Sequence, residues 1–372
     1  MWKTLKTCLI IERSNKSNLY SLIFVAILII GFMLIASDEN FGNPLVDATT
    51  EYQSASTAMS KFQVVDTNSV ENSNTTYGKL SQLRQMISLK QAALKMEKEE
   101  LLNTTSLQVT NLRDALYKTE EFDLVKDLVM PKVHNDNERV FVNALIEREV
   151  SQQQESLQYW QFLLIIFSII GFAWFPFLSF YTSGIMIEDF RHTTILKGYP
   201  VRFDQYVIAK STTKLFMIFS FIILIFIISL PLIQIKGIGE ANYPVIVYTG
   251  TPVAFTIPQY ILLCIGIMFV ITIFTLLLSI IFNMIFKNLY ITLFVQLILY
   301  FLPILFPSLI SELPYNPFNF LNFNMILEGG TLALLNPVDI TFINGLITLS
   351  ISIVVMLIIV QRFLSTGKLK RA

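Results

Sequence analysis

Residues 257–286 read IPQYILLCIGIMFVITIFTLLLSIIFNMIF and contain no charged side chain. A helix needs about 20 predominantly apolar residues to cross the hydrocarbon core of a bilayer. This run is long enough to span a membrane, and it predicts a membrane protein rather than a soluble domain. The whole chain supports the same conclusion, because 53% of its 372 residues are hydrophobic.

Five further segments have the same character. Working outward from 257–286, they are residues 289–310, 215–235, 160–182, 19–36 and 341–360. Only Lys287 and Asn288 separate 257–286 from 289–310, which predicts a tight turn there. Residues 19–36 also have the length of a cleaved signal peptide, but no small-residue cleavage site follows, which favours an uncleaved anchor. We expect six transmembrane helices in an all-α polytopic membrane protein.

Basic residues concentrate in alternate connections between these segments. Placing the N-terminus in the cytosol puts residues 1–18, 183–214, 287–288 and 361–372 inside, and residues 236–256 and 311–340 outside. The basic residues inside are then Lys3, Lys6, Arg13, Lys16, Arg191, Lys197, Arg202, Lys210, Lys214, Lys287, Arg362, Lys368, Lys370 and Arg371. The two short outside loops hold only Lys236. By the positive-inside rule, both termini are expected in the cytosol, with the protein in the cytoplasmic membrane.

Residues 37–159 form a long polar insertion between the first two membrane segments. Its start, residues 38–56, is predicted to be a loop. Helices are predicted from Lys79, over about 106–129, and over about 137–158, the last running into the second membrane segment. Pro131 is expected to end the second of these helices. The insertion is thus expected to be a small helical domain on the extracellular side, with a solvated, charged surface.

The N-terminus, MWKTLKTCLIIERSNK, separates apolar from polar positions at helical spacing. Trp2, Leu5 and Leu9 fall near one face, and Lys3 and Lys6 fall on the other. The pattern predicts that residues 1–18 form an amphipathic helix lying in the inner membrane interface. A basic tail that only sets the topology is the alternative.

The sequence lacks the motifs of an enzyme. It has no G-x-x-x-x-G-K-[ST] phosphate-binding loop, so we expect no ATP hydrolysis by this chain alone. His134 and His192 fall on opposite sides of the membrane in the expected topology and cannot share a metal or catalytic site. Almost no ionisable side chain lies deep in the membrane segments, which argues against an ion-coupled carrier. No cofactor, metal or nucleic acid is expected on this chain.

One polar stripe runs along the quoted segment. Thr272, Thr275, Ser279 and Asn283 are spaced by three, four and four residues, which places them on one face of a helix. Packing of helices through small polar side chains is one explanation. The other is that the stripe lines a translocation path or an interface with a second copy of the chain.

The outer part of the next segment is expected to be irregular. Pro303 and Pro307 predict a kinked or broken end of 289–310. Residues 311–340 are aromatic and apolar but too interrupted to span a bilayer. Such backbone is tolerated at membrane depth only where it is buried in protein or lines a cavity. We expect short re-entrant helices that cap the outer mouth, and a loop resting on the interface is the alternative.

The stretch IEDFRHTTILKGYP, residues 187–200, places charges between two membrane segments. Lys197 suits the last turn of a helix, Gly198 its left-handed cap, and Pro200 a position just beyond. A short helix with charged rims around an apolar centre is typical of a protein–protein contact. A basic loop that only anchors the topology is the alternative. The residues expected to contact a partner are Glu188, Asp189, Phe190, Arg191, Ile195 and Leu196.

These residues carry a family resemblance. With Glu188, Thr194–Leu196, Pro200, Arg202 and Lys210 between its second and third membrane segments, the chain resembles the permease subunit of type-2 ATP-binding-cassette (ABC) exporters. The resemblance covers residues 1–36 and 160–372, and the insertion suits members with an enlarged extracellular domain. It implies that two permeases, identical or homologous, pair in the membrane lipid above two separate ATPase subunits. Those ATPases would bind ATP and Mg²⁺ and move the coupling helix within the cytosolic loop 183–214.

The expected cargo is a hydrophobic or amphipathic peptide, an antimicrobial or a lipid-like compound, because the membrane segments are apolar and uncharged. Two alternatives remain: a sodium-exporter-like ABC permease, and a membrane-anchored sensor or immunity protein that binds an extracellular ligand through residues 37–159. Permeases of the mechanotransmission type have four membrane helices, and the six expected here count against that class.

Overall fold

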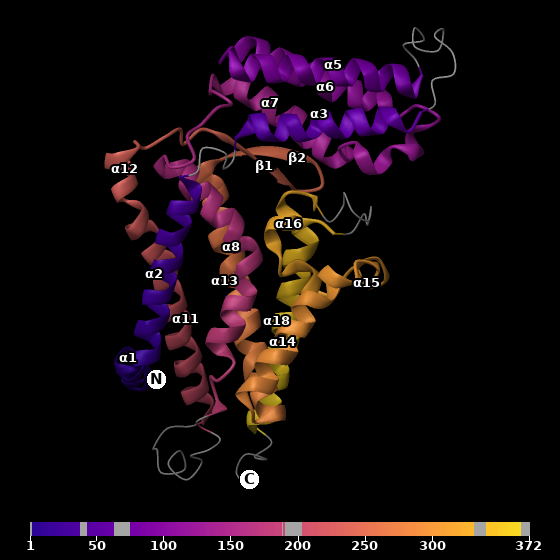
Figure 1. The fold of residues 1–372 in the computed structure, drawn as a ribbon. Coiled ribbons are helices and arrows are strands. Elements are labelled where there is room, and N and C mark those ends of the chain that lie inside the picture. The colour runs from indigo at the N-terminus through magenta and orange to yellow at the C-terminus, as the bar shows by residue number, and fades with distance from the viewer. Residues whose placement is uncertain are drawn as a thin grey trace.

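The computed structural model describes residues 2–37, 43–62, 75–187, 189, 203–330 and 340–365. Helices make up 79% of the structure. Long apolar helices form one bundle, shorter polar helices form a second bundle at one end of it, and a β-hairpin lies between the two (Figure 1). The N-terminal helix α1 (Trp2–Ser14) and the C-terminal end of α18 (Phe342–Ser365) lie at the opposite end of the apolar bundle.

Five helices are long and apolar enough to cross a membrane, so the chain is a mostly helical, membrane-embedded protein. They are α2 (Lys16–Ala36), α8 (Tyr159–Thr182), α11 (Phe203–Ser229) with its continuation α12 (Pro231–Ile235), α13 (Ile257–Phe286), and α18. Within these helices, 61% of the spanning window of α13 is buried but only 11% of that of α2. Helix α13 is therefore central and α2 peripheral.

The sixth expected segment is shorter than predicted. Helix α14 (Leu289–Leu305) has 17 residues, which at 1.5 Å per residue is about 26 Å, against about 30 Å for the hydrocarbon core. The chain leaves the helix at Phe306, between Pro303 and Pro307, and resumes as α15 (Ser308–Glu312). The predicted break is present because neither proline can donate a backbone hydrogen bond to the preceding turn.

The turn between α13 and α14 has the expected position. Lys287 ends α13 in the left-handed conformation, with φ 50°. Asn288 then caps α14, since its side-chain oxygen accepts from the backbone N–H of Tyr290 at 2.9 Å. These two residues reverse the chain, so α13 and α14 are antiparallel neighbours.

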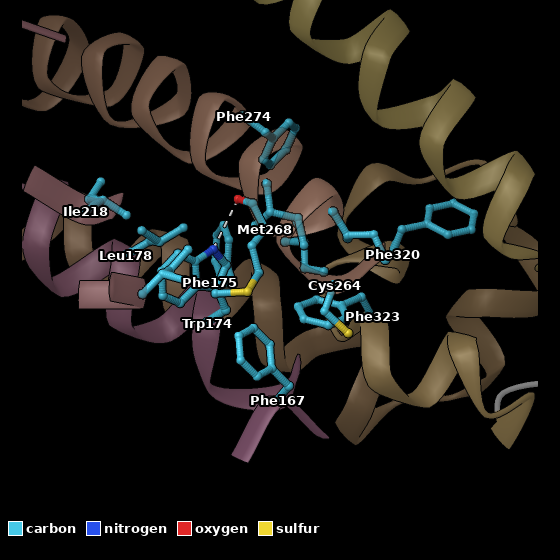
Figure 2. Close-up of a cluster of buried hydrophobic side chains, with 14 of the residues drawn as sticks. Phe167, Trp174, Phe175, Leu178, Ile218, Cys264, Met268, Phe274, Phe320 and Phe323 are labelled. Carbon is cyan, nitrogen blue, oxygen red and sulfur yellow. Dashed lines mark hydrogen bonds between the residues drawn. The ribbon is translucent and has the colours of Figure 1, made fainter. Parts of the chain in front are cut away.

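A dense aromatic core joins α8 to α13 (Figure 2). Phe167, Trp174 and Phe175 of α8 are buried together with Cys264 and Met268 of α13. The indole Nε1 of Trp174 donates to the carbonyl oxygen of Met268 at 3.2 Å. The short helices η3 (Pro317–Phe320) and α16 (Phe323–Leu327) add Phe320 and Phe323 to the same cluster. Residues 308–327 thus contain three short helices packed on the bundle.

The polar bundle, here named the insert domain (residues 43–158), is helical as expected. It consists of α3 (Pro44–Ser60), α5 (Thr76–Lys95), α6 (Glu99–Leu116), η1 (Phe122–Leu124), η2 (Lys126–Leu128) and α7 (Lys132–Arg148). Three predictions were wrong in detail. The loop expected over 38–56 is helical from Pro44, which stands at the first turn after the capping residue Asn43.

The other two concern helix ends. The helix expected over 106–129 begins earlier, at Glu99, and ends at Leu116. The helix expected to run from 137 to 158 into the membrane ends at Arg148, where Glu149 adopts the left-handed conformation with φ 54°. Residues 150–158 instead form an irregular link, tied to α5 by Gln153 Nε2, which donates to the Leu94 carbonyl oxygen at 3.0 Å.

Buried charges hold the insert domain together. Arg113 of α6 is completely buried and pairs with Glu51 of α3 and Glu138 of α7. Lys90 of α5 lies 2.6 Å from the other oxygen of Glu138. Burial alone would raise the pKa of Glu138, but Lys90 and Arg113 lower it to about 2. Burial alone would lower the pKa of Arg113, but Glu138 and Glu51 raise it above its ordinary value.

A short β-hairpin accompanies the helices, and the mostly helical structure is consistent with the all-α prediction. Strands β1 (Pro244–Tyr248) and β2 (Pro252–Thr256) pair antiparallel, with Pro244 opposite Thr256. Thr256 also begins α13, through a capping box with Gln259. Arg148 at the end of α7 donates to the carbonyl oxygens of Asn242, Ala254 and Phe255 at 3.0, 2.8 and 3.2 Å. The hairpin therefore connects the insert domain to the N-terminus of α13.

Candidate functional site

The polar stripe of α13 is completely buried within one chain. Thr272, Thr275, Ser279 and Asn283 each have no exposed surface. Thr272 and Thr275 donate to carbonyl oxygens of their own helix, at 2.6 and 2.7 Å. Such bonds satisfy a hydroxyl at membrane depth without a partner helix. Only Ser279 and Asn283 of the four make side-chain hydrogen bonds to other helices within the part of the chain that the structure describes.

Ser279 and Asn283 belong to what we name the polar seam: Thr182, Ser279, Asn283, Thr292 and Gln296. The hydroxyl oxygens of Thr182 and Ser279 are 2.7 Å apart. Gln296 Nε2 donates to Ser279 Oγ at 2.8 Å, and Thr292 Oγ1 donates to Asn283 Oδ1 at 3.4 Å. The seam thus joins α8, α13 and α14, and all five residues are completely buried.

Helix α14 contributes a polar stripe of its own. Thr292, Gln296 and Tyr300 recur every four residues, and all three are buried. Tyr300 OH donates to the Phe172 carbonyl oxygen of α8 at 2.5 Å. This stripe was not predicted from the sequence, although the spacing rule that marks the stripe on α13 applies to it as well. In this conformation the polar seam stabilises the packing of α8, α13 and α14, as polar side chains do in apolar bundles.

A second polar group, here named the inner cluster, lies at the end of the bundle that holds α1. Its members are Glu12, Asn18, Tyr181, Asp189, Tyr206, Lys210 and Lys214. Lys214 Nζ lies 2.8 Å from Glu12 Oε2 and 4.8 Å from the ring centroid of Tyr181. Asn18 Nδ2 donates to the same Glu12 oxygen at 2.8 Å. This pairing ties α1, α2 and α11 to one another.

Asp189 is the predicted coupling residue that the structure describes. Its two oxygens lie 2.6 Å from Lys210 Nζ and 2.9 Å from Tyr206 OH. It is buried, with 8% of its surface exposed, and therefore pairs within the chain and anchors the connection to α11. The remaining predicted coupling residues lie outside the described residues: Glu188, Phe190, Arg191, Ile195 and Leu196.

A third polar group fixes α16 at the other end of the bundle. Asn324 Oδ1 accepts from Ser168 Oγ of α8 at 3.3 Å and from Tyr260 OH of α13 at 3.1 Å. Asn324 Nδ2 donates to Glu328 Oε1 at 3.0 Å. The insert domain reaches the same place, because Asn137 Nδ2 of α7 donates to the Glu328 carbonyl oxygen at 2.9 Å. Sequence alone gave no signal for the contacts of Asn324 with α8 and α13 or of α7 with Glu328, which join distant segments.

Metal ligands do not gather in the part of the chain that the structure describes, where no group of three His, Cys, Asp or Glu side chains is placed to hold an ion. Cys8 and Cys264 are both free and buried. No protein-family model matches the chain, and no curated protein or solved structure is detectably similar to it.

Proposed function

We propose that the chain is the permease subunit of an ATP-driven exporter resembling the type-2 ABC family, in the cytoplasmic membrane with both termini in the cytosol. The inner cluster gives the strongest support. Helix α11 pairs through Lys210 with Asp189, in the connection from α8, and through Lys214 with Glu12 of α1. A partner that displaces this connection would move α11 and α1 together, because breaking a buried ion pair is costly.

In this proposal the insert domain is extracellular and the chain crosses the membrane six times. Residues 289–310 form the fifth crossing, of which α14 is the regular helical part. Two permeases, identical or homologous, pair in the lipid, and two separate ATPase subunits dock beneath them. Those subunits bind ATP and Mg²⁺, and they contact this chain through the stretch 187–200, which includes Phe190.

The proposed cargo is a hydrophobic or amphipathic peptide, an antimicrobial or a lipid-like compound. Helices α8, α13 and α14 meet along the polar seam and carry no charged residue. An apolar cargo does not need charged partners at membrane depth, whereas an ion-coupled carrier usually does. A sodium-exporter-like permease differs in cargo alone, and Na⁺ efflux from loaded vesicles distinguishes it.

Affinity purification from membranes of the native host tests the proposal. We expect the wild-type chain to bring down a subunit with a phosphate-binding loop, and the complex, not the chain alone, to hydrolyse ATP. Phe190→Asp should lose that subunit, because a buried unpaired charge costs about 3–5 kcal/mol. At about 1.4 kcal/mol per decade, docking falls by two or more decades. Leu124→Asp, on the exposed surface of the insert domain, is the matched control and should retain the subunit.

The outcomes separate the alternatives. Purification of the wild-type chain without any such ATPase contradicts the permease assignment. Retention of the ATPase by Phe190→Asp means that residues 187–200 only anchor the topology.

A membrane-anchored sensor or immunity protein is the second candidate. The hydrogen bond from Asn137 to Glu328 supports it, since a ligand that moved α7 would also move α16. It predicts ligand binding by the full chain in the absence of an ATPase, which calorimetry against a candidate extracellular peptide would measure.

A further inference from the structure

The polar seam contains two polar atoms without a protein partner among the described residues. Asn283 Nδ2 and Gln296 Oε1 are both buried and accept or donate no hydrogen bond there. Asn283 and Gln296 are completely inaccessible from the surface. Burying a polar atom without a partner is costly, and nearly all such atoms in proteins bind either protein or an ordered water. A ligand that forms hydrogen bonds with both atoms would remove this cost.

The two atoms lie on successive rungs of one ladder. One rung is the Asn283–Thr292 pair, and the other is the Ser279–Gln296 pair. Ser279 and Asn283 are one turn apart on α13, as Thr292 and Gln296 are on α14, so the rungs are about 5–6 Å apart. Two hydrogen bonds of about 2.8 Å through a single oxygen span up to about 5.6 Å. A single oxygen atom between the rungs therefore matches the spacing of the two pairs.

We propose that the polar seam binds a water molecule, which accepts a hydrogen bond from Asn283 Nδ2 and donates one to Gln296 Oε1. The atoms to be satisfied are one donor and one acceptor, and water supplies both functions. A metal cation cannot accept from the amide N–H, and an anion cannot donate to the amide oxygen. Buried waters make about three hydrogen bonds, and the hydroxyl pair of Thr182 and Ser279 is the neighbouring group that supplies the third.

Exchange of oxygen and nitrogen in either carboxamide leaves this requirement in place. If one of the two amides is rotated by about 180°, the two unpartnered atoms become two donors or two acceptors. If both amides are rotated, the unpartnered atoms are again one donor and one acceptor. Water satisfies every one of these arrangements, because it donates two hydrogen bonds and accepts two. Its presence would let the α13–α14 contact loosen without leaving a bare amide in the apolar interior. The inference does not depend on the proposed transport function.

Solid-state NMR on the full chain in lipid bilayers tests the proposal directly. With ¹⁵N-labelled asparagine and glutamine, magnetisation should pass from water to the Asn283 side-chain NH₂ group, assigned by its loss in Asn283→Leu. Asn135 is the matched control. It is equally buried, but its NH₂ group donates to the Thr110 carbonyl oxygen at 3.0 Å and to Asp114 Oδ1 at 2.9 Å. Its signal should therefore show no transfer from a bound water.

The variant Gln296→Met removes the acceptor and keeps the volume of the side chain. We expect it to expel the water and to reduce the transfer at Asn283 to the level seen at Asn135. Absence of transfer at Asn283 in the wild-type protein overturns the proposal. So does transfer that Gln296→Met leaves unchanged, because the water would then not bridge the two amides. If Gln296→Met does not accumulate, the wild-type comparison of Asn283 with Asn135 decides whether the water is present.

Discussion

Lys214 shows how a single residue can hold a charge at the start of an apolar helix. The residues after it, 215–229, contain no charged side chain. Placing a lysine in that apolar environment without a partner costs free energy. Glu12 neutralises its ammonium group, and the face of Tyr181 lies against it. Asn18 donates to Glu12 and accepts from Tyr181 OH, so the hydrogen bonds of the pair are shared among four side chains.

We predict that Lys214→Met destabilises the protein by about 3–5 kcal/mol, because it leaves the Glu12 carboxylate buried without its partner. Thermal unfolding followed by tryptophan fluorescence measures the change. The double variant Glu12→Gln/Lys214→Met removes both charges and should recover most of the loss. Lys236→Ala is the control, since the Lys236–Glu155 pair is 40% and 49% exposed and contributes at most about 1 kcal/mol. Equal effects of Lys214→Met and Lys236→Ala would contradict the prediction.

At the scale of elements, the contact between α8 and α16 depends on the absence of a side chain. A Cβ atom at Gly171 would lie 2.5 Å from Asn324 Cβ and 3.0 Å from its backbone nitrogen. That space allows Asn324 to reach Ser168 and Tyr260 together. The three short helices of residues 308–327 are too small to hold this position by their own stability, so the close approach to α8 is what fixes α16.

Gly171→Ala is predicted to push α16 away from α8 and to cost about 1–3 kcal/mol, as overpacking of a close contact does. Gly266→Ala in α13 is the matched control, because a Cβ atom there meets nothing within 4 Å. Hydrogen exchange of α16, together with the unfolding temperature, measures both variants. If Gly171→Ala matches Gly266→Ala in both measurements, α16 is not held by this contact.

Helices α3, α5, α6 and α7 of the insert domain should separate together in acid. The pKa of Glu138 is lowered from 4.5 to about 2, so its stabilising effect is present above about pH 4.5 and is lost as the pH falls toward 2. Glu138→Gln should therefore be less stable at pH 7 by on the order of 3 kcal/mol, with the difference from wild type shrinking below pH 4.5. Circular dichroism of the full chain against pH measures it, with the exposed Glu147→Gln as control. A difference that grows on acidification would show that Glu138 is not the paired carboxylate.

Sequence could predict the elements whose secondary structure is determined by their own amino-acid composition. Uncharged runs such as 257–286 form helices because no other structure satisfies their backbone in lipid. The elements missed depend on contacts between segments. Nothing near Glu149 marks the end of α7, which stops where Arg148 reaches the hairpin carbonyls. The β-branched residues on either side of Gly250 are typical of strands, but residues 236–256 were predicted only as an outside loop.

The same division holds for the candidate site. The stripe on α13 was visible as a spacing, and its burial follows from the central position of that helix. What the stripe contacts was not visible, because Thr182, Thr292 and Gln296 come from two other helices. Glu12 and Lys214 are 202 residues apart, and no local pattern pairs them.

At the scale of the whole molecule, the positions of the two chain ends constrain the number of membrane crossings. Helix α1 and the C-terminal end of α18 lie at the same end of the apolar bundle, and the insert domain lies at the other (Figure 1). Five crossings would place the two ends on opposite sides of a membrane. The proposed topology, with both ends on one side, therefore needs α14, with the short helices after it, to carry the chain across as a sixth crossing.

We therefore predict that intact cells label Ser88→Cys, in the insert domain, with a membrane-impermeant maleimide, and label Ser365→Cys and Lys6→Cys only after permeabilisation. Ser88 is exposed on α5, and the native Cys8 and Cys264 are buried and should give little background. Lys6 tests the N-terminal side and Ser365 the C-terminal side, so together they report whether the number of crossings is even. Labelling of Ser365→Cys but not Lys6→Cys in intact cells would mean an odd number, with α14 entering the membrane and returning. Labelling of both, without Ser88→Cys, would reverse the orientation and place the inner cluster outside, where no ATPase could reach it.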